Sequence, residues 1–130
     1  MIDVEADVFN AVYPAVEPLV PAGCFRSVYV PNPPAFPFAT LMEIDNATDR
    51  KSRSSSLDEG YAVVTYEANV YAEDKQECRD VMNALDAALT RMNFARLSMQ
   101  FVPNLLDVTL HRITARYQAT AGSDKTIYRK

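Results

Sequence analysis

The segment 61–72 constrains the fold more than any other part of the chain, because apolar residues occupy every second position in it. In an extended conformation one face would carry Ala62, Val64, Tyr66, Ala68, Val70 and Ala72, and the other would carry Val63, Thr65, Glu67 and Asn69. This alternation predicts an antiparallel strand with one face in the core and the other toward water. The fold therefore contains a sheet that is covered on one side.

The residues that follow directly, 75–92, predict an amphipathic helix. Asp74, with Glu77 three residues later, resembles a capping box in which Asp replaces the usual Ser or Thr. Apolar residues then recur at spacings of three and four and trace one face, namely Cys78, Val81, Met82, Leu85, Ala88, Leu89 and Met92. A strand that leads straight into such a helix indicates a helix packed on the covered face of the sheet.

Weaker patterns predict the remaining elements. A first helix is expected over 3–18, where valines recur every four residues; Asp3 can cap it, and Pro14 predicts an end or a bend near Tyr13. Strands are expected over 24–30, 38–45, 96–102 and 108–119. We therefore predict a single α+β domain over 1–130, with an antiparallel sheet of about four to five strands of mixed length and two helices packed on one face.

Two segments are predicted to lie outside the packed core. Residues 46–60 contain almost no apolar side chains and predict a mobile loop, which is long for so small a domain and therefore a candidate for function. Residues 120–130 predict an extended, basic C-terminal tail. The candidate partner contacts in these two segments are Arg50, Lys51, Arg53, Lys125, Arg129 and Lys130.

Charge is divided between the two ends of the chain, although the net formal charge is only -4. Residues 1–22 carry the acids Asp3, Glu5, Asp7 and Glu17 and no base, whereas 111–130 carry Arg112, Arg116, Lys125, Arg129 and Lys130 against Asp124 alone. Two explanations remain open: the ends attract each other within one chain, or oppositely charged surfaces meet when copies assemble. Under the second explanation, Asp3, Asp7, Arg112 and Arg116 are also candidate contacts.

The composition is that of an ordinary globular protein, with 48% hydrophobic and 23% charged residues. Its apolar runs fall short of the roughly 20 residues that a membrane span requires. The acidic N-terminus lacks the basic start of a secretory signal, so we expect a cytosolic origin. Cys24 and Cys78 have no metal-ligand spacing, and for Cys78 a buried thiol is favoured over a disulfide.

No catalytic pattern stands out, and we expect no enzymatic activity, no cofactor and no metal site. His111 is the single histidine and could serve as a general base, but no Ser or Cys has a predictable relation to it. Three widely separated glycines cannot build a phosphate loop. Arg112 and Arg116 share one strand face and, with the bases of the 46–60 loop, would suit nucleic-acid phosphates, although the acids in that loop favour a solvated loop.

The whole layout resembles that of the tail terminator, or tail completion, proteins of long-tailed bacteriophages. The likeness covers nearly the full chain and rests on the helix start DVEADVF (3–9), the strand end TLMEI (40–44), the polar loop, the strand YEANVYA (66–72) that runs into the helix, and the final strand LHRITARYQA (110–119). These are general sequence patterns without invariant catalytic residues, and related neck proteins share them.

The resemblance implies a structural virion protein that forms a ring, expected to be a hexamer, caps the completed tail tube and offers the joining surface for the head connector. DNA would pass through the pore without sequence-specific binding. The partners would be further copies of the chain, the tail tube protein and the head connector or neck protein, with no membrane contact. The location would be the tail–neck region of the virion, after assembly in the host bacterial cytoplasm.

Other interpretations stay open. The chain could be a related head–tail connector or neck protein. It could be a small ligand- or peptide-binding α+β module, in which aromatic residues line a cleft. It could also be an enzyme built around His111, for which a loss of activity without loss of fold in His111→Ala would be required.

Overall fold

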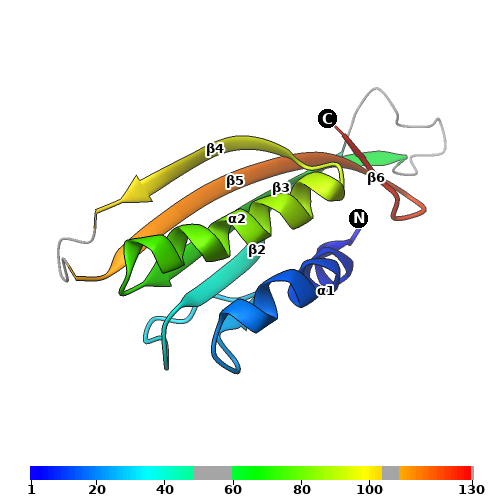
Figure 1. Ribbon diagram of the computed structural model, residues 1–130. Helices are drawn as coiled ribbons and strands as arrows, with labels where there is room; N and C mark the ends of the chain where they lie inside the picture. Colours follow the sequence, from blue (N-terminus) through cyan, green and yellow to red (C-terminus); the bar gives the residue numbers. More distant parts are fainter. Residues whose placement is uncertain (49–59, 104–108, 130) are drawn as a thin grey trace.

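The computed structural model describes residues 1–48, 60–103 and 109–129. The elements run in the order α1 (Glu5–Val16), a short 3-10 helix η1 (Glu17–Leu19), β1 (Phe25–Arg26), β2 (Phe38–Thr48), β3 (Tyr61–Ala72), α2 (Lys75–Arg91), β4 (Ala95–Val102), β5 (His111–Gly122) and β6 (Ile127–Arg129). The predicted α+β class is confirmed (Figure 1).

The strands form one curled sheet with the spatial order β1-β2-β3-β5-β4, and β6 also pairs with β5. All pairings are antiparallel except the two-residue pairing of β1 with β2, which is parallel. β3 and β5 pair from Tyr61↔Gly122 to Ala72↔His111 and form the centre. On its other side, β5 pairs with β4 through residues 112–118 and with β6 through residues 119–121. The single strand β5 therefore joins three others.

Both helices lie on the same face of the sheet, as predicted (Figure 1). α2 packs across β3 and β5, and α1 lies beside α2 on the β2 side. The core between helices and sheet contains the predicted face of β3, the residues Ile113, Ala115, Tyr117 and Ala119 of β5, and the apolar stripes of both helices. The strand β4 lies at the end of the strand order and pairs with β5.

Helix α1 runs through Pro14 instead of ending near Tyr13. The valine stripe explains this difference, because Val8, Val12 and Val16 are all fully buried. Burying that stripe outweighs the hydrogen bond that proline cannot donate. The predicted cap is present in part, since Asp3 Oδ1 accepts a hydrogen bond from the Glu5 N–H at 3.3 Å.

The strand expected over 24–30 is wrong in its length, because only Phe25–Arg26 pairs with β2. Beyond it the side chains of Val28 and Tyr29 are exposed, and the proline-rich stretch that follows lacks the donors of a sheet ladder.

Two predicted boundaries also shift, because pairing with β3 extends both of its neighbours. β2 continues to Thr48, so the loop expected from residue 46 begins later, and its residues 49–59 lie outside the described residues. The extended tail expected over 120–130 is corrected as well. Residues 120–122 complete β5, and Ile127–Arg129 folds back onto it as β6.

Both ends of α2 are capped by side-chain and backbone hydrogen bonds. Asp74 Oδ2 accepts from the Glu77 N–H at 3.1 Å, as the capping pattern predicts. At the other end, Asn93 adopts a positive φ of 71°, and the Phe94 N–H donates to the Leu89 carbonyl at 3.0 Å. Asn93 Nδ2 also donates to the Ile127 carbonyl at 3.1 Å, which ties the helix end to β6.

Candidate assembly surfaces

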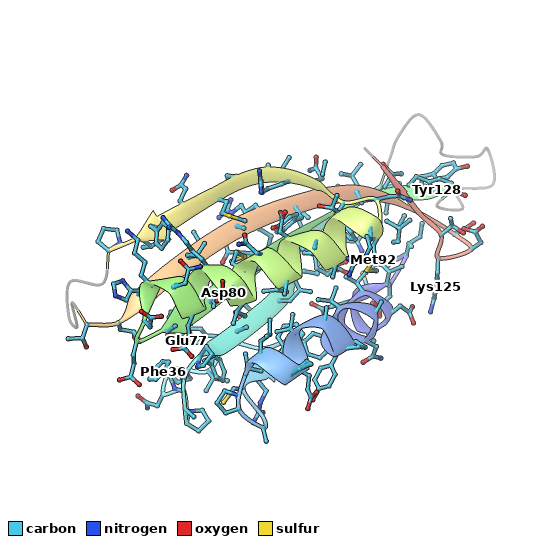
Figure 2. The ribbon with its side chains drawn as sticks, viewed as in Figure 1. Phe36, Glu77, Asp80, Met92, Lys125 and Tyr128 are labelled. Atoms are coloured by element: carbon cyan, nitrogen blue, oxygen red, sulfur yellow. The ribbon has the colours of Figure 1, made fainter. Side chains whose placement is uncertain are left out.

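The two oppositely charged ends of the chain meet within the molecule. Lys125 lies on the turn between β5 and β6 and points toward the N-terminal part of α1 (Figure 2). Its Nζ is 3.7 Å from Asp7 Oδ2, and both side chains are largely exposed. For this pair the contact supports the first explanation of the divided charge, attraction within one chain. Asp3 is also exposed and caps α1.

Arg112 and Arg116 lie on the face of the sheet that the helices leave uncovered, as their alternation predicts. Arg116 forms an ion pair with Glu67 at 3.2 Å. Arg112 donates from Nε and Nη2 to Asn69 Oδ1 at 3.2 and 2.9 Å, and its guanidinium lies 5.5 Å from the centre of the Tyr71 ring. Both guanidinium groups are therefore held by neighbours on β3, where they stabilise the pairing of β3 with β5.

The remaining predicted contacts have side chains that fall outside the part of the chain that the structure describes. Arg50, Lys51, Arg53 and Lys130 lie outside the described residues. Arg129 ends β6, but its side chain is also outside the described part of the structure. Among the predicted residues that the structure describes, it brings together Asp7 and Lys125 and places Arg112 and Arg116 on one face.

The two edges of the sheet differ in how their backbone groups are covered. At the β2 edge, β1 pairs with the start of the strand, and Glu5 Oε2 accepts from the Glu43 N–H at 2.8 Å. A register shift between Glu43 and Asp45 bends β2 at that point. Asn46 Nδ2 adds a hydrogen bond to the Ile2 carbonyl at 2.7 Å. Side chains and the N-terminal segment thus cover this edge.

The β4 edge is open by comparison. Among the described residues, β4 pairs with β5 only, which leaves one side of an eight-residue strand without a ladder partner. Two large apolar side chains are exposed on it, Leu97 at 54% and Phe101 at 42%. An exposed strand edge with apolar side chains readily pairs with another chain unless charges or a covering element prevent it.

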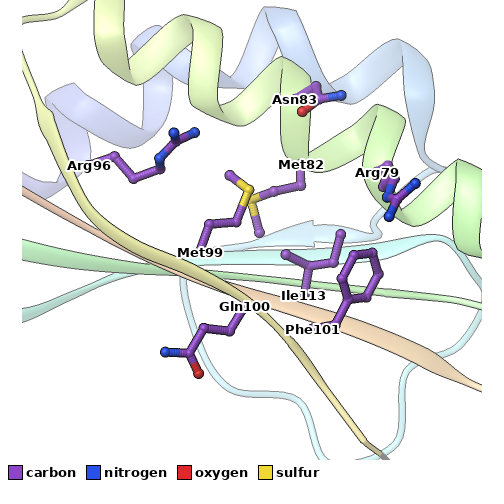
Figure 3. Close-up of a pocket in the computed structure, with 8 residues that line it drawn as sticks. All are labelled: Arg79, Met82, Asn83, Arg96, Met99, Gln100, Phe101 and Ile113. Atoms are coloured by element: carbon purple, nitrogen blue, oxygen red, sulfur yellow. The ribbon is translucent and has the colours of Figure 1, made fainter.

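A groove separates α2 from β4 (Figure 3). It has a volume of about 400 Å³. Met82 of α2 meets Met99 of β4 at its floor, beside Ile113 of β5 and Phe101 (Figure 3). The rim is polar and is formed by Arg79, Asn83 and Arg96, whereas the Gln100 side chain points away from Met82 and Met99 (Figure 3). An apolar floor with a polar rim is typical of a surface that binds a side chain or a short segment of a partner.

Two cations stand over the exposed aromatic ring of this groove. Lys75 Nζ lies 4.9 Å, and the Arg79 guanidinium 5.0 Å, from the centre of the Phe101 ring. Such contacts are favourable because the ring face carries negative potential. Within the described residues neither Lys75 nor Arg79 forms an ion pair with a carboxylate. This end of the groove therefore carries two cations that have no ion pair within the described part of the chain.

The groove continues toward the end of α2 as a second hollow of about 280 Å³, lined by Asp86, Thr90, Phe94, Ala95 and Arg96. Here the charges are balanced. Arg96 Nη1 lies 3.2 Å from Asp86 Oδ1, and the same oxygen accepts from the Tyr117 hydroxyl at 2.8 Å. This part of the surface is held by internal bonds, unlike the end near Lys75 and Arg79.

A polar pair of the sheet lies close to α1, with Tyr66 buried and Glu43 partly buried. Glu43 and Tyr66 are directly opposite each other on β2 and β3, and in the described structure Glu43 Oε1 and Tyr66 Oη reach no hydrogen-bond geometry. Burial raises the pKa of Glu43, and the charges of Glu5 and Asp3 raise it further against the opposing effect of nearby Tyr66 and Asn46. The pKa of Tyr66 also lies well above its usual value because of burial.

The residues considered for chemistry are Cys24, Cys78 and His111, of which His111 begins β5. Burial raises the pKa of the Cys78 thiol to about 11, and its Sγ contacts the backbone carbonyl of His111 at 3.8 Å. Cys24 and Cys78 are both free and buried. Among the described residues, no three His, Cys, Asp or Glu side chains are placed to hold a metal ion. In the same part of the chain, no helix has the length and apolar character needed to cross a membrane.

Comparison with known proteins gives a relationship in structure only. No protein-family model and no curated protein sequence matches this chain. A solved structure that does match is a chain from the virion of a native gene transfer agent particle, with a TM-score of 0.61 over 85% of this chain and 90% of that one. The sequence identity is 17%, so the likeness concerns architecture. The two chains share a fold.

Sequence reasoning missed the groove and the cations Lys75, Arg79 and Arg96 that border it. One signal was available, since Lys75 and Arg79 are four residues apart and must share one side of the helix. The location of that side over Phe101 follows only from the position of β4 relative to α2, which no local pattern specifies.

Proposed function

We propose that this chain is a structural subunit of a phage-like virion and that copies of it assemble side by side into a ring. The shared fold with a chain of the gene transfer agent virion carries this proposal. The open edge of β4, with Leu97 and Phe101 exposed, also supports it. The unpaired backbone groups and exposed apolar side chains of such an edge favour contact with another chain.

Within the virion, we assign the chain to the tail–neck region, where a tail terminator caps the completed tail tube and offers the joining surface for the head connector. The resemblance of the whole sequence to terminators supports this assignment. The ring would be a hexamer that DNA traverses, with the tail tube and head connector as partners and no enzymatic role. A related neck protein is the nearest alternative.

The arrangement of the sheet is compatible with a ring. Its two edges differ, since β1, Glu5 and the N-terminal segment cover the β2 edge and β4 leaves the other open. Two unlike surfaces that bind each other form a head-to-tail contact. Repeated head-to-tail contacts close into a ring when the rotation between neighbouring subunits adds up to a full turn.

The test is the oligomeric state of the full chain, measured by light scattering over a wide concentration range and by negative-stain imaging, alone and with purified tail tubes. We expect rings with a central hole, free in solution or on tube ends. A chain that stays monomeric alone and does not bind tube ends would overturn the proposal.

One observation favours a second candidate function. The groove between α2 and β4 is large enough for a small ligand or for a peptide side chain. A monomer whose melting temperature rises with a small molecule or peptide, and which never binds tail tubes, would indicate a small binding module instead.

A further inference from the structure

We propose that the groove between α2 and β4 binds the acidic outer side of α1 from the next copy of the chain. This inference rests on the ring proposed above and specifies the surfaces that join its subunits. Neither the fold likeness nor the terminator resemblance identifies these surfaces.

The receiving surface has accessible apolar area and two cations without an ion pair in one place. Met99 and the partly exposed Phe101 supply the accessible apolar area, above the buried Met82 and Ile113. Lys75 and Arg79 lie over that ring without a carboxylate partner among the described residues. Asp86 pairs with Arg96 farther along, so the cations of the groove that lack an ion pair among the described residues are Lys75 and Arg79.

The matching surface is the solvent side of α1 and its continuation. Its exposed residues are Asp3, Ala6, Asp7, Asn10, Ala11, Tyr13, Pro14, Glu17, Pro18 and Leu19. This surface carries acids and no base, and it includes two exposed apolar side chains, Tyr13 at 40% and Leu19 at 44%. It thus complements the groove in charge, and Tyr13 or Leu19 can fill the apolar floor.

Asp7 is available for such a contact. Its in-chain partner Lys125 is 3.7 Å away, and the side chains are 64% and 60% exposed, respectively. Exposed pairs of this kind are held weakly, so a cation of a neighbouring copy can share or replace Lys125.

The positions of the two surfaces suit a head-to-tail contact. The groove lies at the β4 edge, and α1 lies on the β2 side, with β3 and β5 between them (Figure 1). Each copy can therefore bind one neighbour through its groove and another through α1. A contact of β4 with β4 of a second copy would instead use the same surface on both subunits, so assembly would end at a dimer.

Crosslinking tests the geometry without altering any charge. Asn10 lies on the exposed side of α1, and Asn83 lines the groove. Asn10→Cys with Asn83→Cys in one chain should give, on mild oxidation, a ladder of dimers, trimers and larger species. A mixture of equal amounts of the two single variants should give disulfide-linked dimers and no larger linked species. Each single variant alone should give no disulfide-linked species, although it still assembles. Native Cys24 and Cys78 are buried and do not compete.

Charge exchange tests the recognition. Arg79→Glu should require a concentration about tenfold higher for assembly, because it opposes an acidic helix to an acidic groove. Asp7→Lys should weaken assembly as well, and the two substitutions in one chain should restore it. Arg91→Glu is the matched control: it changes the charge of the same helix equally, lies outside the groove, and should leave assembly unchanged.

The outcomes separate this inference from the proposed ring. Rings that form in the wild type, give no ladder with the cysteine pair and tolerate Arg79→Glu would overturn the groove assignment while the ring remains. Disulfide-linked dimers from a single-cysteine variant would indicate a symmetric contact and would overturn the head-to-tail contact. A wild-type chain that never assembles, alone or on tail tubes, would overturn the ring and this inference together.

Discussion

Tyr66 and Tyr117 stand directly opposite each other at the centre of the sheet, both fully buried, yet only the Tyr117 hydroxyl has a hydrogen-bond partner among the described residues. The Tyr117 hydroxyl donates to Asp86 Oδ1 at 2.8 Å. The Tyr66 ring packs edge-on against Phe94, and its hydroxyl adds no such bond. Two identical side chains in paired positions therefore differ in what their oxygen contributes.

Removing these two hydroxyl groups should have unequal effects. Tyr117→Phe should lower the free energy of unfolding by about 1.5–3 kcal/mol, since it removes a hydrogen bond to a charged group. Tyr66→Phe serves as the control and should cost clearly less, because it removes a buried oxygen that forms no good bond. Urea unfolding at neutral pH measures both. Equal losses in the two variants would contradict this account.

The Asp7–Lys125 ion pair should contribute little to the stability of the isolated chain. We expect a coupling energy below about 1 kcal/mol in a double-mutant cycle of Asp7→Asn with Lys125→Asn, because both groups are exposed. Asparagine is the suitable replacement at Lys125, whose φ is 66°. A markedly larger coupling would mean that Asp7 is not free to meet another copy.

Glu43 should make the fold less stable as the pH rises through the acid range. Its pKa in the folded state is raised above 4.5, so the folded chain holds this proton more tightly than the unfolded chain does. The stability gained from the protonated carboxyl is complete below the pKa of the unfolded state, and it is lost as the pH rises through the pKa of the folded state. Glu43→Gln should therefore exceed the wild type in unfolding free energy at pH 7, with the difference shrinking toward pH 4. A difference that is constant with pH would refute the assignment.

The end of α2 should depend on the conformation of Asn93. Asn93→Ala should lower the free energy of unfolding by about 1–3 kcal/mol, because alanine is disfavoured at positive φ and the bond to the Ile127 carbonyl is lost. Asn93→Gly accepts the positive φ and loses only that bond, so it should cost less. Thermal melts of the two variants measure the order, and a reversed order would exclude the left-handed cap.

The parts of the fold that the sequence predicts well are those that local physics determines. The alternation of 61–72 and the stripe from Cys78 to Met92 correspond to β3 and α2, and the cap at Asp74 is present. The predictions were wrong where distant partners decide. Thr48 is a strand residue because β3 pairs with it, and the tail at Ile127 returns to the sheet because β5 offers a free side.

The candidate site was less predictable for the same reason. Basic residues could be counted from the sequence, but Arg116 is neutralised by Glu67, whereas Arg79 has no carboxylate partner in the described structure. That difference depends on which strand lies beside each side chain. Periodicity assigns a residue to a face and does not identify the element that covers it.

The central place of β5 has a consequence for synthesis of the chain. β3, α2 and β4 are all translated before β5, yet β3 and β4 each depend on it for a neighbour. Until residues 111–122 emerge from the ribosome, a nascent chain therefore has β3 paired only with β2 and has no neighbour in the sheet for β4, so its sheet is completed late. Any surface that depends on the completed sheet, including the groove beside β4, is absent from unfinished chains, so only fully translated copies can join one another.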